Sequence, residues 1–157
     1  MPKKIKLKFE NESGDKLSAW LEKPIMAKPK AYAIFAHCFT CSKNLKAIGN
    51  ISRALTQQGF SVLRFDFTGL GESEGDFSGT NFSSNVDDLL AAAKFMETKF
   101  QAPSLLIGHS LGGAAVLHAA SKLSSVKAVA TIGAPSSPKH VKKLISSSKS
   151  EIEQQGK

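Results

Sequence analysis

Hydrophobic and polar residues alternate twice near the start of the chain, over positions 5–9 and 17–21. Alternation with a period of two is typical of a β-strand that buries one face. Ser13, Gly14 and Asp15, which lie between the two runs, are residues that favour a turn. The pattern therefore predicts an antiparallel hairpin at the N-terminus.

The chain then alternates apolar, strand-like segments with segments of helical period. The run AYAIFA at 31–36 is continuously apolar, as in strands that are buried on both faces of a parallel sheet. We expect strands at 31–36, 60–65, 104–107 and 126–132, and helices at 44–58, 81–100 and 111–123. Because successive strand–helix–strand units make right-handed crossovers, this order predicts an α/β fold with a parallel sheet between helices.

A change of pattern after Pro135 divides the chain in two. Residues 1–135 carry the regular alternation and are predicted to form the core of the fold. Ser137 can cap a helix, Pro138 suits a first helical position, and apolar residues become sparse beyond them. We therefore interpret residues 136–157 as the start of a cap or a surface helix.

Composition and charge narrow the class of protein. A chain of 157 residues with 41% hydrophobic residues can bury one core, and its apolar runs fall far short of the roughly 20 residues that cross a bilayer. We expect a soluble protein that does not associate with membranes. The net charge of +8 is compatible with nucleic-acid binding, but the lysines are scattered and no aromatic residues are interleaved with them. We therefore expect no nucleic-acid partner.

The chain has two cysteines, Cys38 and Cys41, which are too close in sequence to join distant parts of a fold. So few cysteines suit a reducing cytoplasm, where we expect the protein to reside. Their C-x-x-C spacing also occurs in redox and zinc motifs, yet no second pair of ligands accompanies it. We expect neither a metal nor a cofactor, and a thiol redox role through Cys38 and Cys41 remains an alternative function.

The motif GHSLG at 108–112 lies between a predicted strand and a predicted helix. This is the context of a nucleophile elbow, in which the serine occupies a strained turn and small neighbours prevent collisions. The alternative is an ordinary glycine-rich turn in which Ser110 only caps a helix. We identify Ser110 as the candidate catalytic nucleophile.

The segment HCFT at 37–40 follows the first buried strand directly, where such enzymes place a second oxyanion donor. We expect the backbone N–H groups of Phe39 and Leu111 to form an oxyanion hole, in which such donors are worth several kcal/mol. The catalytic histidine of this class follows the nucleophile in chain order. We therefore expect the His37 side chain to order the loop rather than to act as a base.

Three other candidates are assigned structural roles. Asp66, after the strand at 60–65, could be a catalytic acid by type, but it precedes Ser110, whereas the order of this class is serine, acid, histidine. His118 and His140 fall in predicted helices and are interpreted as ordinary packed or solvated residues. We expect no histidine of this chain to reach hydrogen-bonding distance of Ser110 Oγ.

Four segments together resemble the α/β-hydrolase superfamily, in particular its serine-aminopeptidase-like and esterase-like members. They are HCFTCS at 37–42, RFDFTGLG at 64–71, TNFSSN at 80–85 and GHSLGG at 108–113. Their amino-acid sequences are most similar to the hydrolase half of bacterial two-part proteins, in which an OsmC-like peroxide-reducing domain follows. The resemblance implies the N-terminal part of an α/β-hydrolase fold and a possible OsmC-like domain in a longer parent.

In that family the hydrolase domain continues through a cap to two more strands and then to an aspartate and a histidine, which positions 1–157 do not supply. The resemblance implies a serine hydrolase that acts on a small-molecule ester, thioester or amide through an acyl-enzyme at Ser110. This chain alone is then expected to be nearly inactive. The alternative of another class is a non-catalytic binding or scaffold module that keeps the fold.

The last predicted strand, 126–132, is expected to lie at an unpaired edge of the sheet, because the family's further strands are absent. Free N–H and C=O groups on an apolar strand are a template for pairing with another chain. We expect self-association through this edge, or its coverage by the helix that begins near Pro138.

Overall fold

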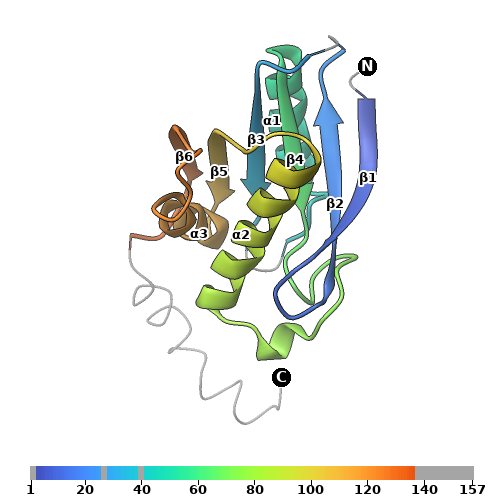
Figure 1. Ribbon diagram of the computed structural model, residues 1–157. Coiled ribbons are helices and arrows are strands. Elements are labelled where there is room, and N and C mark those ends of the chain that lie inside the picture. The colour runs from blue at the N-terminus through green and yellow to red at the C-terminus, as the bar shows by residue number, and fades with distance from the viewer. Residues whose placement is uncertain (1–2, 26–27, 39–40, 137–157) are drawn as a thin grey trace.

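The computed structural model, which describes residues 3–25, 28–38 and 41–136, contains the hairpin and the alternating strands and helices that the pattern predicts. Figure 1 shows them around a single sheet. The strands are β1 (Lys3–Glu10), β2 (Lys16–Lys23), β3 (Ala31–Ala36), β4 (Phe60–Phe65), β5 (Leu105–His109) and β6 (Ala128–Ile132). The helices are α1 (Lys46–Gln57), the 3₁₀ turn η1 (Phe77–Gly79), α2 (Phe82–Lys99) and α3 (Leu111–Ala120).

The six strands lie in the order β1-β2-β4-β3-β5-β6. β1 and β2 pair antiparallel, and β2 pairs antiparallel with β4, whereas β4, β3, β5 and β6 run parallel to one another. This is the α/β-hydrolase arrangement of an N-terminal hairpin followed by parallel strands. Because parallel strands point the same way, the loops that follow β3, β4 and β5 all lie at one end of the sheet, where Ser110 and His37 are found.

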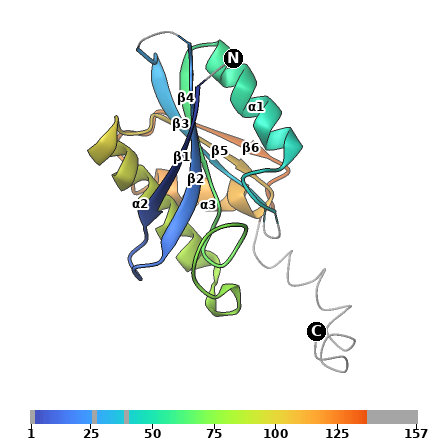
Figure 2. The same ribbon diagram turned by 90° about the vertical axis from the view of Figure 1, so that its right-hand side faces the viewer.

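Helices cover both faces of the sheet, α1 on one side and α2 with α3 on the other (Figure 2). Side chains of a strand point alternately to the two faces. In β3, accordingly, Ala33 and Phe35 join Ile48 of α1 in the smaller core cluster, whereas Ile34 belongs to the larger cluster with Met96 of α2. The continuous apolar run of β3 is explained by its burial on both faces.

The start of α2 shows how local chemistry sets an element boundary. Ser84 N–H donates to Asn81 Oδ1 at 3.0 Å, and Asn81 N–H donates to Ser84 Oγ at 2.9 Å. This reciprocal capping box satisfies two N–H groups that the first helical turn would leave without acceptors. It gives a structural reason for the TNFSSN segment at 80–85.

The predicted bounds differ from the structure by a few residues at several elements. α3 ends at Ala120, not at 123, because the chain turns there, with hydrogen bonds from Lys122 N–H to Ala119 and from Val126 N–H to Leu123. β6 correspondingly begins at Ala128. The turn η1, which Asp76 caps, was not predicted. The cap or surface helix expected within 136–157, with His140, falls almost wholly outside the described residues.

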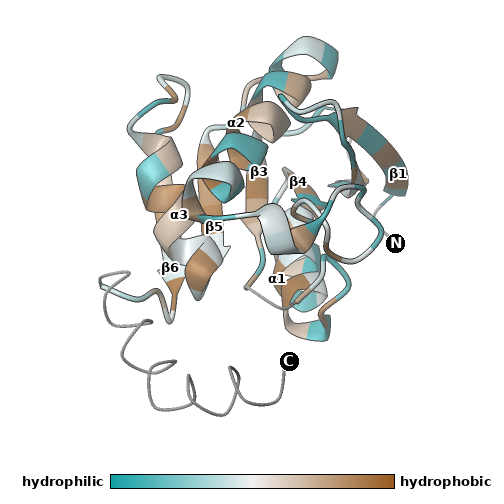
Figure 3. Ribbon diagram, turned by 90° about the horizontal axis from the view of Figure 1, so that it is seen from below, coloured by the Kyte–Doolittle hydropathy of each residue, from teal (hydrophilic) through white to brown (hydrophobic). Residues whose placement is uncertain are grey.

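Within the described residues β6 forms one edge of the sheet and pairs with β5 alone, as predicted. Most of its side chains are exposed, and Ile132 is 42% exposed. Figure 3 shows apolar colour along this edge beside α3. No helix in the described part combines the length and the apolar character needed to cross a membrane.

Candidate active site

Ser110 lies at the turn between β5 and α3, where it precedes the first helical residue, Leu111. Its φ is 54° and its ψ is −121°, and it is the one non-glycine residue with positive φ among the described residues. A side chain in this region of backbone space is strained, at a cost of about 1–3 kcal/mol. The strained backbone conformation predicted for Ser110 at this turn is therefore confirmed.

The glycines of the GHSLGG segment are required by close packing around this turn. A Cβ atom on Gly108 would collide with the backbone of Gly112, and one on Gly112 would collide with the carbonyls of Ala36 and His37. Gly112 thus brings the start of α3 against the end of β3. The elbow and the loop that follows β3 can lie side by side because neither Gly108 nor Gly112 carries a side chain.

Backbone hydrogen bonds fix the elbow from both sides. Ser110 N–H donates to Ile132 O of β6 at 2.8 Å, and Ser110 O accepts from Gly113 N–H at 2.9 Å. Because Leu111 is the first residue of α3, its own N–H has no acceptor within the helix. A helix N-terminus favours nearby negative charge, so the free N–H of Leu111 is suited to donate a hydrogen bond to an oxyanion.

The second predicted oxyanion donor, Phe39, lies outside the described residues, so the convergence of its N–H with that of Leu111 stays a prediction. The residues before it are described. His37 is buried, its Nε2 accepts from Phe67 N–H at 3.3 Å, and its Nδ1 lies 2.6 Å from Cys38 O. Because Phe67 N–H can only donate, the neutral ring carries its proton on Nδ1 and donates it to Cys38. His37 therefore orders the loop, as expected.

No described histidine hydrogen-bonds to Ser110 Oγ. His37 is committed to the loop, the ring of exposed His118 packs edge-on against Phe82 at 6.0 Å, and His109 has a buried Nδ1 without a partner. His140 lies outside the described residues. In the described part of the chain, no histidine is thus hydrogen-bonded to the serine as a general base would be.

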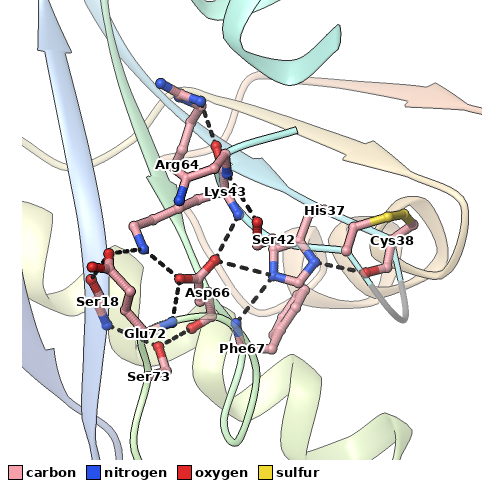
Figure 4. A network of polar contacts seen from close by, with 12 residues as sticks. Ser18, His37, Cys38, Ser42, Lys43, Arg64, Asp66, Phe67, Glu72 and Ser73 are labelled. Carbon is pink, nitrogen blue, oxygen red and sulfur yellow. Dashed lines mark hydrogen bonds and ion pairs between the residues drawn. A yellow bond between two sulfur atoms is a disulfide. The ribbon is translucent and has the colours of Figure 1, made fainter. Parts of the chain in front are cut away.

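Asp66 is the centre of a buried polar network that anchors the same loop at its far end (Figure 4). Asp66 and Lys43 are both 0% exposed. One carboxylate oxygen of Asp66 accepts from Lys43 N–H at 2.6 Å, and the other accepts from Glu72 N–H at 3.0 Å and pairs with Lys43 Nζ. Lys43 Nζ also contacts Glu72 Oε2 at 2.7 Å. Asp66 therefore has the structural role that chain order predicted.

Arg64, two residues earlier on β4, holds the carbonyl of the same lysine. Its guanidinium donates to Lys43 O and pairs with Glu22 of β2. Lys43 is thus held by its N–H, its carbonyl and its ammonium group. Sequence reasoning missed Lys43, because a lysine beside the predicted helix at 44–58 reads as an exposed cap residue and its acidic partners lie 23 and 29 positions away.

Two pKa shifts follow from these contacts. Hydrogen bonds from Lys43, and then from Lys6, lower the pKa of the Glu72 carboxyl to about 2. Burial lowers the pKa of His37 below its usual range, although the Cys38 carbonyl and the Asp66 carboxylate act in the opposite direction. His37 is accordingly neutral at pH 7, which its acceptor role toward Phe67 requires.

Gly71 and Gly69 let the loop after β4 close around this network. Gly71 has a φ of 54°, and a Cβ there would collide with the Asp66 carboxylate; Gly69 has a φ of 72°, and a Cβ there would collide with Phe77. The glycines of RFDFTGLG at 64–71 are thus explained by close approach to Asp66 and to η1.

Cys38 and Cys41 are joined by a disulfide in the structure. Their Cα atoms are 5.2 Å apart, and Cys41 N–H donates to Cys38 O at 3.1 Å, which closes a tight turn. Within the described residues no group of three His, Cys, Asp or Glu side chains is arranged to hold a metal ion.

Two surface hollows among the described residues lie away from Ser110. One, between β1 and α2, is lined by residues such as Lys8, Phe95 and Lys99, and the other is lined by Asp15, Asp76 and Asp87. A much smaller cavity between His37, Leu111 and Gly112 separates the loop from the elbow and is too small for a substrate.

Comparisons with known proteins give a consistent result. The family model described as serine aminopeptidase, S33, matches residues 27–152. A solved esterase domain from Rhodothermus marinus is 56% identical, with a TM-score of 0.75, over 89% of this chain and 54% of that chain. A Xanthomonas campestris α/β serine hydrolase without a lid is 26% identical, with a TM-score of 0.76, over 87% and 63% of the two chains.

Among curated proteins, the mitochondrial palmitoyl-protein thioesterase ABHD10 of Rattus norvegicus is 30% identical over 87 residues, which are 55% of this chain and 28% of that protein. The chain thus spans 54% and 63% of these two solved structures and 28% of the curated relative.

Proposed function

Because the chain belongs to the serine aminopeptidase S33 family of α/β-hydrolases, we propose that it supplies the nucleophile of a serine hydrolase, with Ser110 attacking an acyl carbonyl to form an acyl-enzyme. The observation that carries the proposal is the positive φ of Ser110 at the β5–α3 turn. A protein that used this serine only as a helix cap would have no reason to keep the strain, since Ser110 makes no side-chain cap hydrogen bond to α3.

The oxyanion of the tetrahedral intermediate would be bound by the backbone N–H groups of Leu111 and Phe39. The helix-start position of Leu111 and the fixed carbonyl of Cys38 support this assignment. Removing one such donor costs about 10²–10³ in kcat in related chemistry. Both donors are backbone groups, so a side-chain substitution at either position does not remove them.

The general base and the acid that orients it come, in this proposal, from outside the described residues. No described histidine is hydrogen-bonded to Ser110 Oγ, His37 is committed to the loop, and Asp66 is neutralised by Lys43. A base and an acid after the nucleophile agree with the chain order of the family. This chain by itself is then nearly inactive, retaining only the catalysis of an oxyanion hole and binding, about 10³–10⁴-fold over water.

We propose a small-molecule ester or thioester, or a small amide, as the substrate. Relatives whose names are esterase and palmitoyl-protein thioesterase support an acyl carbonyl with an oxygen or sulfur leaving group. A cytoplasmic location, an OsmC-like domain in a longer parent, and self-association through the exposed edge of β6 belong to the same proposal.

Labelling with a fluorophosphonate tests the proposal, because this probe reacts only with an activated serine. In the natural protein that contains this chain, we expect a single adduct on Ser110, located by peptide mass spectrometry. The chain 1–157 alone should label about 10²–10⁴-fold more slowly, because in this proposal the general base is not part of it. Ser110→Ala should abolish labelling, and Ser121→Ala, at the exposed end of α3, should leave it unchanged.

An unlabelled Ser110 in the natural protein, or a label on another serine, would overturn the proposal. The first result would instead favour the non-catalytic scaffold that keeps the hydrolase fold.

A further inference from the structure

The turn that contains Cys38 and Cys41 lies directly after β3 and has a chemistry that the hydrolase reaction does not use. The two Cα atoms are 5.2 Å apart, within the range of about 4.4–6.8 Å that a disulfide spans. Both residues are partly exposed. The chain has no third cysteine that could compete for either of them.

Contacts that involve neither sulfur atom hold the two flanks of this turn. On one side, buried His37 donates to Cys38 O and accepts from Phe67 N–H. On the other, Lys43 is bound at its N–H and its ammonium group by Asp66 (Figure 4). When the disulfide is reduced, these anchors remain, so the two thiols stay close together. Such preorganisation favours closure of the ring over reaction with separate small thiols.

The same disulfide contributes little to holding the whole fold together. It closes a ring over two intervening residues, and the stabilisation that a disulfide gives the folded state grows with the length of the chain it closes. Reduction should therefore leave β3, β4 and the core intact. A bond that forms readily and breaks without unfolding has the properties of a reversible redox site, not of a structural staple.

We propose that Cys38 and Cys41 form a reversible dithiol–disulfide site that exchanges with small-molecule disulfides and thiols. In the oxidising direction, one cysteine thiolate attacks the small disulfide, forms a mixed disulfide and releases one small thiol. The second cysteine thiolate then attacks the protein sulfur of that mixed disulfide and releases the second small thiol. Two electrons and two protons pass from the cysteine pair to the small disulfide, and a dithiol reverses the reaction.

A redox titration of this chain tests the site without any need for hydrolase activity. The reduced chain is equilibrated without oxygen in buffers of reduced and oxidised glutathione at increasing oxidised fraction, quenched with acid, and alkylated with N-ethylmaleimide. Mass spectrometry then counts blocked thiols. We expect the two thiols to become protected from alkylation together. The fraction of molecules with both thiols protected should rise from about one tenth to about nine tenths across the buffer series, and dithiothreitol should reverse it fully.

Cys38→Ser and Cys41→Ser provide the matched comparison, since each leaves one thiol without its partner. Each variant should accumulate a single glutathione adduct where the wild-type chain forms the internal disulfide. Two alkylatable thiols at every buffer composition, or a stable double glutathione adduct in the wild-type chain, would overturn the proposal. Because alkylation is the readout, an unreactive Ser110 would refute the proposed hydrolase function without affecting this result.

Discussion

The elbow at Ser110 and the loop between β3 and α1 lie against each other, yet different forces hold them. The elbow is held by close backbone packing. Gly108 and Gly112, which have no side chains, allow backbone to approach backbone, and Ser110 takes the strained conformation. The loop is held by buried polar contacts. Asp66 binds Lys43, and neutral His37 bridges Cys38 to Phe67. One half of the site depends on shape, whereas the other depends on charge and protonation.

The difference has a consequence for how each half fails. Backbone packing tolerates changes of pH and salt but not added volume. A buried ion pair tolerates neither the loss of one partner nor a shift in protonation, because the remaining charge has no solvent to stabilise it. The two halves can therefore be disturbed separately.

The largest effect is expected at the loop, from Lys43→Met. Methionine fills a similar volume but leaves the Asp66 carboxylate buried without its cation. Removing one partner of a buried pair costs about 3–5 kcal/mol, which is a large part of the stability of a small domain. Urea denaturation followed by circular dichroism measures the free energy of unfolding.

Lys46→Met is the matched control, since Lys46 is exposed at the start of α1 and a surface substitution of this kind usually stays within about 0.5 kcal/mol. Equal losses in the two variants would show that the buried network does not anchor the loop.

A smaller effect is expected at the elbow, from Gly112→Ala. The added Cβ collides with the carbonyls of Ala36 and His37, so α3 must move away from the end of β3. Overpacking of this kind costs about 1–3 kcal/mol, and the displaced Leu111 N–H should also slow fluorophosphonate labelling of the natural protein. Gly79→Ala is the control, because a Cβ at Gly79 meets no atom within 4 Å. A Gly112→Ala protein with unchanged stability and labelling would contradict the close approach.

The smallest effect is a dependence on pH that only the loop should show. The folded-state pKa of His37 lies below its unfolded value of about 6.5, so the unfolded chain binds the proton first. Stability is therefore complete above that pH and falls as the pH decreases through it, by at most about 1.4 kcal/mol per pH unit. The Glu72 carboxyl, with its pKa near 2, loses its stabilising contribution only below the unfolded pKa of about 4.3.

Urea denaturation between pH 7.5 and 5.5 measures this slope. His37→Asn should be less stable at pH 7.5 but should show a flatter dependence, whereas His118→Asn, at an exposed position on α3, should keep the slope of the wild-type chain. A His37→Asn protein with an unchanged slope would show that another group titrates.

Hydrophobic periodicity was sufficient to predict the order of the elements, and β3 and β4 match the predicted ranges. The elbow could be predicted as well, because its cause is local: a serine between glycines, after an apolar strand and before a helix. Boundaries such as the end of α3 at Ala120 were less accurate, since they depend on turns whose hydrogen bonds compete with one more helical turn.

The sequence by itself thus determined the order of the strands and helices and the strained place of Ser110, because both follow from patterns among residues close along the chain. Only the tertiary structure decided that Lys43 is buried, that Asp66 neutralises it, and that Arg64 reaches its carbonyl. These partners are more than 20 residues apart, and one-dimensional patterns treat a lysine as exposed. A charge can be buried only where folding brings an opposite charge to it. Here the pairing of β4 with β3 in the sheet brings Asp66 next to Lys43.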